Sequence, residues 1–155
     1  MASSVDRVRA ALEQHGHDGA LRRFPESTRT AEEAAAAIGC TVAQIAKSIV
    51  LRTGDRPVLV VASGVNRVDP AKVAGLVGGP VKRADAAWVR EVTGFAIGGV
   101  APVGHLTQPI VLIDQSLETL DPIWAAAGSP NEVFSTGFAA LVAISGGRVA
   151  DVKEG

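Results

Sequence analysis

Aromatic and sulfur-containing side chains are scarce in this chain. Its 155 residues include no tyrosine, one cysteine, one methionine and only 4% aromatic residues. Because the single cysteine, Cys40, has no partner within the chain, an internal disulfide and a multi-cysteine metal site are excluded. Since 47% of the residues are hydrophobic, the core must consist mainly of valine, isoleucine, leucine and alanine. The length predicts a single domain, residues 1–155.

Long apolar runs and an excess of one charge are also missing. No run approaches the roughly 18 residues of a membrane span, and residues 1–7 lack the charged-then-apolar order of a signal peptide. These absences predict a cytoplasmic protein with no membrane partner. The net charge of −1 argues against a broadly basic surface, so a nucleic-acid partner would need a local basic patch. Candidates for it are Lys72, Lys82, Arg83 and Arg90.

The three histidines are dispersed along the chain. His15 and His17 lie close together, but no third ligand follows them in the sequence, so a polar helix end explains them better than a metal site. We expect neither a metal nor a cofactor.

Short helices are predicted by their capping residues. An amphipathic pattern predicts a helix over 5–15. N-cap residues followed by glycines at the C-terminal end predict helices over 30–39, 69–78 and 85–94. Residues 117–127 and 138–144 also have the pattern of helices, the first with a break at Pro122.

Strands are predicted between these helices. Two apolar runs, 48–52 and 57–62, flank a turn and predict a hairpin. Further strands are expected at 110–113, 132–135 and 147–152. A hairpin combined with helical crossovers indicates a mixed sheet in an α/β or α+β domain.

Residues 98–105, Gly-Gly-Val-Ala-Pro-Val-Gly-His, are typical of a binding loop. Glycines let a backbone approach a ligand closely and the proline fixes one φ, so neighbouring N–H groups are free to point at an anion or a carbonyl oxygen. A tight turn that requires small residues is the alternative.

Lys47 is a second candidate functional residue. Thr41 and Gln44 have capping-box spacing, which predicts a short helix from Thr41 with Lys47 near its end. A lysine there can extend to solvent. Alternatively, its ammonium could reach a phosphate or a developing oxyanion from a fixed base.

The segment Ser63-Gly64-Val65-Asn66 follows the second hairpin strand. Ligands often bind at strand ends, although a capping turn explains the same residues.

Three segments together resemble the YbaK/prolyl-tRNA-synthetase-associated editing domain in its free-standing form. They are 28–35 (TRTAEEAA), 44–50 (QIAKSIV) and 98–105 (GGVAPVGH). The likeness runs from about residue 20 to the C-terminus, which divides the chain into a helical extension, 1–20, and the editing domain, 21–155. It implies a mixed, partly barrel-like sheet flanked by short helices.

The resemblance also implies an activity, hydrolysis of the ester between a wrong amino acid and the terminal adenosine of a tRNA. The family's lysine falls on Lys47 and its Gly-x-x-x-Pro element on Gly98 to Pro102. The expected catalytic residues are Lys47, Gly98 and Gly99. The expected substrate-binding residues are Thr30, Ile45, Ser63, Gly64, Asn66, Val100, Pro102, Gly104, His105 and Asn131.

One position departs from the family pattern. Where Gly-x-Pro-His is common, this chain has Gly128-Ser129-Pro130-Asn131. An asparagine can donate and accept hydrogen bonds but does not titrate. The departure leaves the specificity class open.

No protein nucleophile stands out in the sequence. The chain has no Gly-x-Ser-x-Gly elbow and no zinc signature, and an activated ester can be hydrolysed by water once it is positioned and its oxyanion is stabilised. We expect a trans-editing deacylase for tRNA of proline identity that carries alanine or cysteine. Its partners would be the tRNA acceptor end and, as a candidate, a synthetase. The alternatives are a non-catalytic module that binds a nucleotide or the acceptor end, and an accessory protein without turnover.

Overall fold

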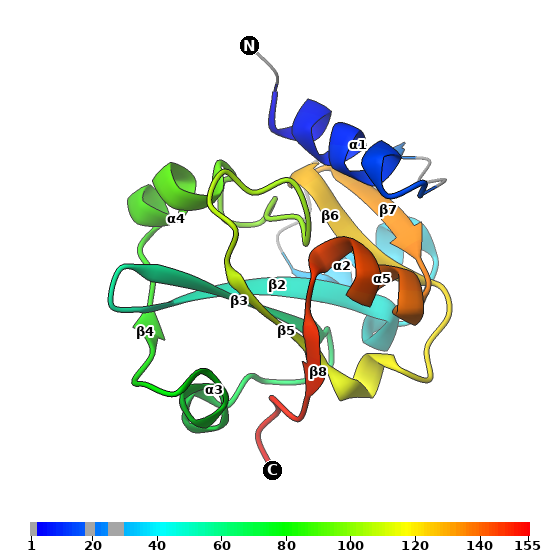
Figure 1. Cartoon of the computed structure of the whole chain (residues 1–155). Helices are drawn as coiled ribbons and strands as arrows, with labels where there is room; N and C mark the ends of the chain where they lie inside the picture. Colours follow the sequence, from blue (N-terminus) through cyan, green and yellow to red (C-terminus); the bar gives the residue numbers. More distant parts are fainter. Residues whose placement is uncertain (1–2, 18–20, 25–29) are drawn as a thin grey trace.

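The computed structural model describes residues 3–17, 21–24 and 30–155. Helices and strands alternate along these residues (Figure 1). In chain order they are α1 (Ser4–Gln14), β1 (Leu21–Arg23), α2 (Ala31–Ile38), the 3₁₀ turn η1 (Val42–Gln44), β2 (Ile45–Thr53), β3 (Arg56–Ser63), α3 (Pro70–Val77), β4 (Lys82–Arg83), α4 (Ala86–Thr93), β5 (Ile110–Asp114), the 3₁₀ turn η2 (Gln115–Leu117), β6 (Ile123–Ser129), β7 (Glu132–Thr136), α5 (Phe138–Ser145) and β8 (Arg148–Ala150).

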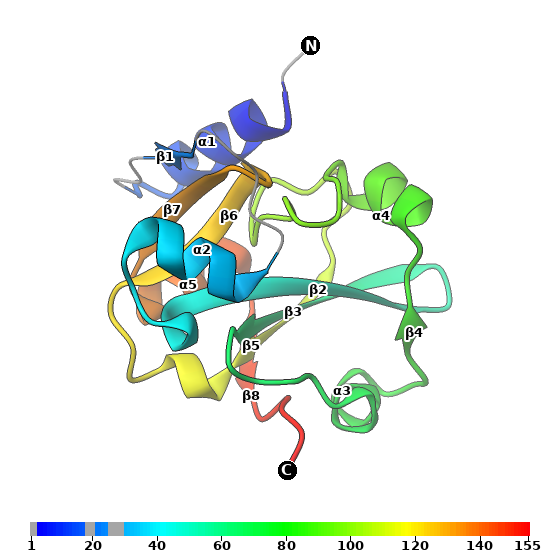
Figure 2. The same ribbon diagram turned by 180° about the vertical axis from the view of Figure 1, so that it is seen from behind.

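The strands form one mixed sheet in the order β1-β7-β6-β2-β3-β5-β8, with β4 paired to β2. The β2–β3 hairpin is antiparallel, whereas β3 with β5 and β5 with β8 are parallel. Helix α1 lies beside β6 and β7, and α2 lies on the opposite side of the molecule (Figures 1 and 2). The mixed sheet flanked by short helices, predicted from the sequence, is confirmed.

Capping residues set the helix boundaries as predicted. The side chains of Thr30, Asp69 and Asp85 accept hydrogen bonds from the first-turn backbone of α2, α3 and α4. Each of these helices ends at a glycine in the left-handed conformation, which costs glycine little because it has no Cβ. Helix α1 begins with a capping box between Ser3 and Asp6.

The helix predicted over 117–127 is wrong. Residues Gln115–Leu117 form a 3₁₀ turn and Ile123–Ser129 form β6. Ile123, Ala125 and Ala127 are buried while Trp124 and Ala126 are half-buried, which is the alternation of a strand. The alanine-rich composition concealed this pattern, since alanine favours helices when tertiary contacts are ignored.

The predicted position of Lys47 at a helix end is also wrong. The capping box at Thr41 and Gln44 is present, but it closes only a three-residue 3₁₀ turn. Strand β2 then begins at Ile45, so Lys47 lies within a strand and pairs with Ala62 of β3. Strands β1 and β4 are too short to give a sequence pattern.

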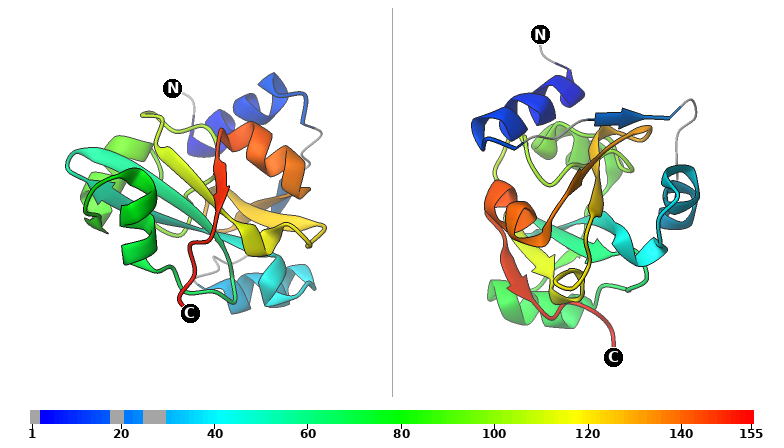
Figure 3. Two further views of the ribbon diagram at one scale, coloured as in Figure 1. Left: turned by 60° about the horizontal axis from the view of Figure 1, so that its bottom comes forward. Right: turned by 90° about the vertical axis from the view of Figure 1, so that its right-hand side faces the viewer.

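Hydrophobic residues pack on both faces of the central strand β3. Val58 and Val60 pack on one face with Val73 of α3. Leu59 and Val61 belong to the larger cluster on the other face, which includes Phe134 and residues of α1 and α5. Helix α1 contributes the fully buried Val8 and Leu12, and it crosses the sheet above β6 and β7 (Figure 3).

A buried carboxylate holds the ends of β3 and β5 together. Asp114 is 0% exposed. It accepts hydrogen bonds from the backbone N–H of Ser63 at 3.0 Å, from the amide of Asn66 at 2.8 Å and from the backbone N–H of Ser116 at 2.9 Å.

Replacing this carboxylate should destabilise the fold. Asp114→Ala leaves its donors without an acceptor in a buried place, so we expect the free energy of unfolding to fall by about 2–4 kcal/mol. Denaturant titration measures this. Glu118→Ala removes an exposed carboxylate nearby and should change stability by less than about 0.5 kcal/mol. Equal stability of the two variants would contradict the role given to Asp114.

Candidate active site

The cavity of interest opens where β2 and β6 separate. These parallel strands pair only at Ile45 with Trp124 and at Ala46 with Ala125. A cavity of about 360 Å³ begins at these two pairs. It is lined by residues of β2 and β6, by the loop after α4, by the turn between β6 and β7, and by the start of α2. Figure 2 shows α2 lying across this side of the sheet. The sequence-predicted residues that line it are Thr30, Ile45, Lys47, Gly64, Gly98 and Val100.

Lys47 projects into this cavity from β2. Its side chain is half-buried. Within the described part of the chain, its ammonium makes no hydrogen bond and no ion pair. A partly desolvated ammonium without a counter-ion is suited to bind an anionic group or a polarised carbonyl oxygen.

The loop over residues 94–104, called the glycine loop below, forms the wall that faces β2. The N–H of Gly99 donates to the carbonyl of Ala96 at 2.9 Å and closes a turn. Among the described residues, the N–H groups of Gly98 and Val100 have no acceptor. A Cβ at Gly99 would lie 2.8 Å from Cα of Ser129, so the loop packs backbone to backbone against the β6–β7 turn. Gly98 has φ +95°, a conformation that glycine adopts readily.

Gly64 permits a second close approach. A Cβ there would overlap the carbonyl oxygen of Val42 and lie 3.0 Å from the Cβ of Ala31. Its N–H donates to the carbonyl of Ile45 at 2.7 Å. The absence of a side chain lets α2 and η1 close over this end of the cavity. Thr30 stands at the rim, where its hydroxyl caps α2 by accepting from the N–H of Glu33.

The other predicted site residues lie behind the walls of the cavity. Ser63 and Asn66 bind Asp114, and the Ser63 hydroxyl also donates to the carbonyl of Ala43 at 2.8 Å. The amide of Asn131 donates to the carbonyl of Phe24 at 3.2 Å and thereby joins the β6–β7 turn to the end of β1. None of these side chains is among the lining residues.

Pro102 and Gly104 lie near the C-terminal end of the glycine loop and His105 directly follows it, and none of the three lines the cavity. The His105 ring lies 2.6 Å through Nε2 from the carbonyl of Ala101 and packs edge to face on Phe95 at 5.0 Å. Burial lowers the pKa of His105; the bond to Ala101 opposes this and the charge of Arg7 adds to it. Since a carbonyl only accepts, Nε2 carries the proton. The imidazole is a structural donor at neutral pH.

Ser48, Trp124, Ser129 and Glu132 also line the cavity, although the sequence analysis did not name them as site residues. Trp124 and Ser129 come from β6, which had been predicted as a helix or left unassigned, and Glu132 comes from the start of β7. The Ser129 hydroxyl lies 2.9 Å from the Glu132 carboxylate. The buried hydroxyl of Ser48 has no hydrogen-bond partner within the described part of the chain. Correct assignment of β6 would have placed Trp124 and Ser129 beside β2.

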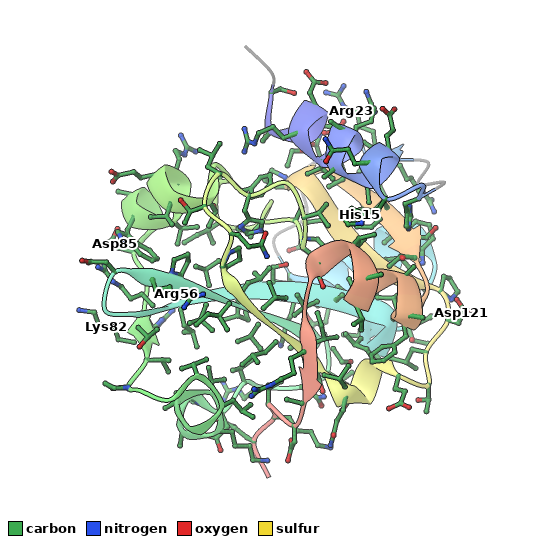
Figure 4. The ribbon with its side chains drawn as sticks, in the orientation of Figure 1. His15, Arg23, Arg56, Lys82, Asp85 and Asp121 are labelled. Atoms are coloured by element: carbon green, nitrogen blue, oxygen red, sulfur yellow. The ribbon has the colours of Figure 1, made fainter. Side chains whose placement is uncertain are left out.

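A smaller cavity of about 170 Å³ adjoins the first. The two share Ser48, Ile49, Ile97, Gly98 and Val100, and the second extends along β2 to Arg83 of β4. Figure 4 shows Arg56, Lys82 and Asp85 at the end of the molecule that carries β4 and the β2–β3 turn. This end therefore has basic groups next to an apolar groove.

The described residues contain no group of three or more histidine, cysteine or acidic side chains placed to hold a metal. Nor does any helix among them have the length and apolar character needed to cross a membrane. Cys40 is half-buried and does not line the cavity. Burial raises the pKa of its thiol, against smaller opposing effects of its backbone hydrogen bond and of Arg22.

Comparison with known proteins identifies the family. The sequence model of the aminoacyl-tRNA editing domain matches residues 25–144. The chain belongs to this family. The uncharacterized protein YwhH of Bacillus subtilis is 35% identical over 129 residues, which cover 83% of this chain and 82% of YwhH. The proline–tRNA ligase of Bacillus licheniformis is 30% identical over 133 residues, which cover 83% of this chain and 23% of the ligase.

Solved structures agree with this assignment. A crystal structure of a candidate trans-editing enzyme for prolyl tRNA synthetase has 45% identity and a TM-score of 0.93, and the match covers 100% of this chain and 99% of that one. The crystal structure of the hypothetical protein APE2540 has 30% identity and a TM-score of 0.88, and the match covers 96% of this chain and 99% of that one. The editing domain described here is therefore an aminoacyl-tRNA deacylase, a hydrolase whose substrate is aminoacyl-tRNA.

The packing of Gly99 predicts a loss of activity on substitution. In Gly99→Ala, the new Cβ must push the loop away from the Ser129 backbone, so we expect kcat/KM for deacylation to fall by about tenfold or more. The free energy of unfolding should fall by about 1–3 kcal/mol. Steady-state kinetics at a temperature where the variant is folded separates the two effects.

Gly75→Ala is the matched control, because a Cβ at this position of α3 meets nothing within 4 Å. It should retain wild-type kinetics. Unchanged kcat/KM in folded Gly99→Ala would show that the loop contact does not shape the site.

Proposed function

We propose that this editing domain acts in trans on tRNA of proline identity and hydrolyses the ester to a wrongly attached alanine or cysteine. The observation that carries the proposal is the Lys47 ammonium, which has no partner among the described residues and lies in the same small cavity as the glycine loop. The likeness to a prolyl-tRNA ligase and to a candidate trans-editing enzyme for prolyl tRNA synthetase supports the tRNA identity.

Lys47 and the N–H groups of the glycine loop would both stabilise negative charge on the substrate. In this proposal the ammonium holds the terminal phosphate or the ester carbonyl. The N–H groups of Gly98 and Val100 stabilise the oxyanion, because they have no acceptor among the described residues. Gly99 allows the close packing that places both donors.

The reaction is an addition followed by an elimination. The oxygen of a water molecule adds to the carbonyl carbon, and the tetrahedral intermediate then expels the ribose oxygen, which takes up the proton released by the water. A ribose hydroxyl of the substrate is suited to position this water. No covalent enzyme intermediate is proposed, because the described lining residues include neither cysteine nor histidine.

Size exclusion would set the acyl specificity. Ile45 and Val100 line the cavity and are only 7% and 3% exposed, so they belong to walls that are packed from behind. Rigid walls accept a methyl or a thiol side chain and reject a larger ring by steric clash. Pro102, an expected lining residue, is a buried part of the loop itself and does not line the cavity, and its ring restricts the loop's backbone.

The acceptor end would enter along the second cavity. Arg83 lies at its far end and Lys82 is its neighbour on β4, and both are exposed. Phosphate contacts of this kind position a nucleic acid without reading its sequence. A prolyl-tRNA synthetase is the proposed protein partner, since it supplies the mischarged tRNA.

Lys47→Ala tests the catalytic assignment. We expect kcat/KM for alanyl-tRNA to fall by roughly 10²–10³-fold, the usual cost of losing one preorganised oxyanion group. The midpoint of thermal unfolding should change little, because the ammonium makes no contact that the fold needs. Lys153→Ala, an exposed lysine near the C-terminus, is the control. A folded Lys47→Ala protein with wild-type rates would disprove the assignment.

A panel of acyl groups on one tRNA tests the specificity. Alanyl and cysteinyl esters of tRNA of proline identity should be hydrolysed about 10–200-fold faster than the prolyl ester. This is the range of rates that small steric differences produce in an apolar pocket. Cys40→Ser should keep these rates, and no acyl-protein should accumulate with excess enzyme. Prolyl-tRNA hydrolysed as fast as alanyl-tRNA, or a trapped Cys40 adduct, would refute the mechanism.

A further inference from the structure

Helix α1 contacts both walls of the cavity although it precedes the residues, 25–144, that the family model matches. One wall is the loop from Gly94 to Gly104, which carries Gly98 and Val100. The other is the turn from β6 to β7, which carries Ser129 and Glu132. Figures 1 and 3 show α1 lying over the end of β6, next to that loop.

Arg7 binds both ends of the glycine loop. Its Nη2 donates to the carbonyl of Gly94 at 2.6 Å and its Nε donates to the carbonyl of Gly104 at 3.2 Å. The guanidinium also stacks 5.0 Å from the ring centre of Phe95, which is 1% exposed. One side chain thus closes the base of the loop.

Close backbone packing fixes this arrangement further. Gly104 has φ +78°, and a Cβ there would lie 3.1 Å from the carbonyl oxygen of Arg7. The helix backbone and the loop are therefore in direct contact. Phe95, which Arg7 covers, packs in turn against His105.

The same helix holds the opposite wall through Ser4. Its hydroxyl donates to the carbonyl of Gly128 at 2.7 Å. Gly128 has φ +102°, and a Cβ there would lie 2.7 Å from the carbonyl oxygen of Ser4. Gly128 directly precedes Ser129, whose backbone touches Gly99. Less than one turn of α1 separates the contacts to the two walls.

We propose that Arg7 is a positioning residue that sets the separation of the two cavity walls by tying the ends of the glycine loop to helix α1. This inference rests on the proposed function for its catalytic consequence. The planar guanidinium offers donors in a fixed fork, which suits it to two carbonyls at once, whereas a lysine ammonium is a single point of attachment. Loss of the fork leaves the donors of Gly98 and Val100 less precisely placed and the acyl chamber wider.

The test compares Arg7→Ala with Arg9→Ala. Arg9 lies on the same helix, is exposed, and forms no side-chain hydrogen bond or ion pair with the described residues. In Arg7→Ala, kcat for alanyl-tRNA should fall by roughly 10–100-fold, and the ratio of alanyl to prolyl hydrolysis should fall as well. Arg7→Lys should recover part of both. Arg9→Ala should match the wild type.

Amide hydrogen exchange gives a readout that does not depend on activity. Arg7→Ala should speed exchange in residues 94–104 and leave exchange in β3 unchanged, because the core strands do not depend on this contact. If the alanine variant does not fold, exchange is measured in Arg7→Lys, where residues 94–104 should exchange faster than in the wild type.

The failures of the two proposals are distinguishable. A wild-type protein that hydrolyses no aminoacyl-tRNA contradicts the proposed function, and loop exchange still decides the role of Arg7. An active wild type whose Arg7→Ala variant keeps its kcat, its acyl selectivity and its loop exchange overturns the positioning role. A lower melting temperature with unchanged kcat and selectivity of the folded protein also overturns it, since that result reduces Arg7 to a stabilising contact.

Discussion

The short parallel pairing of β2 with β6 is the constraint on which the site depends. Two pairs of residues join these strands, and their separation beyond Ala46 and Ala125 leaves the space that becomes the cavity. Lys47 and Ser48 of β2 and Ala126 and Ser129 of β6 are among the residues that line this space. A longer pairing would close the cavity and bury Lys47 against β6.

The cavity can stay open because polar contacts behind its walls keep them in place. Asp114 secures the end of β3, Asn131 secures the β6–β7 turn, and His105 lies beneath the glycine loop. Each of these groups forms at least one hydrogen bond inside the protein. Lys47 differs from them, because its half-buried ammonium has no hydrogen-bond or ion-pair partner among the residues that the structure describes. Such a group costs stability that a functional site can retain.

Local signals determined the helices and the first hairpin. N-cap residues and C-terminal glycines act within one helical turn, so the three helices between Thr30 and Gly94 could be predicted from neighbouring residues alone. The same holds for the apolar strands β2 and β3. Lys47 and the Gly98 loop were identified as candidates from the residues themselves and again through the family resemblance, and Lys47, Gly98 and Val100 line the cavity.

The tertiary structure decided what the sequence could not. Residues 123–129 have helical composition, but pairing with β2 and β7 makes them a strand, because the hydrogen bonds and burial that a sheet offers outweigh a weak intrinsic preference. Trp124, Ser129 and Glu132 reach the site only through that pairing. Short-range chemistry therefore determined the capped helices and the β2–β3 hairpin, whereas contacts between distant segments made β6 a strand and decided which side chains share the cavity.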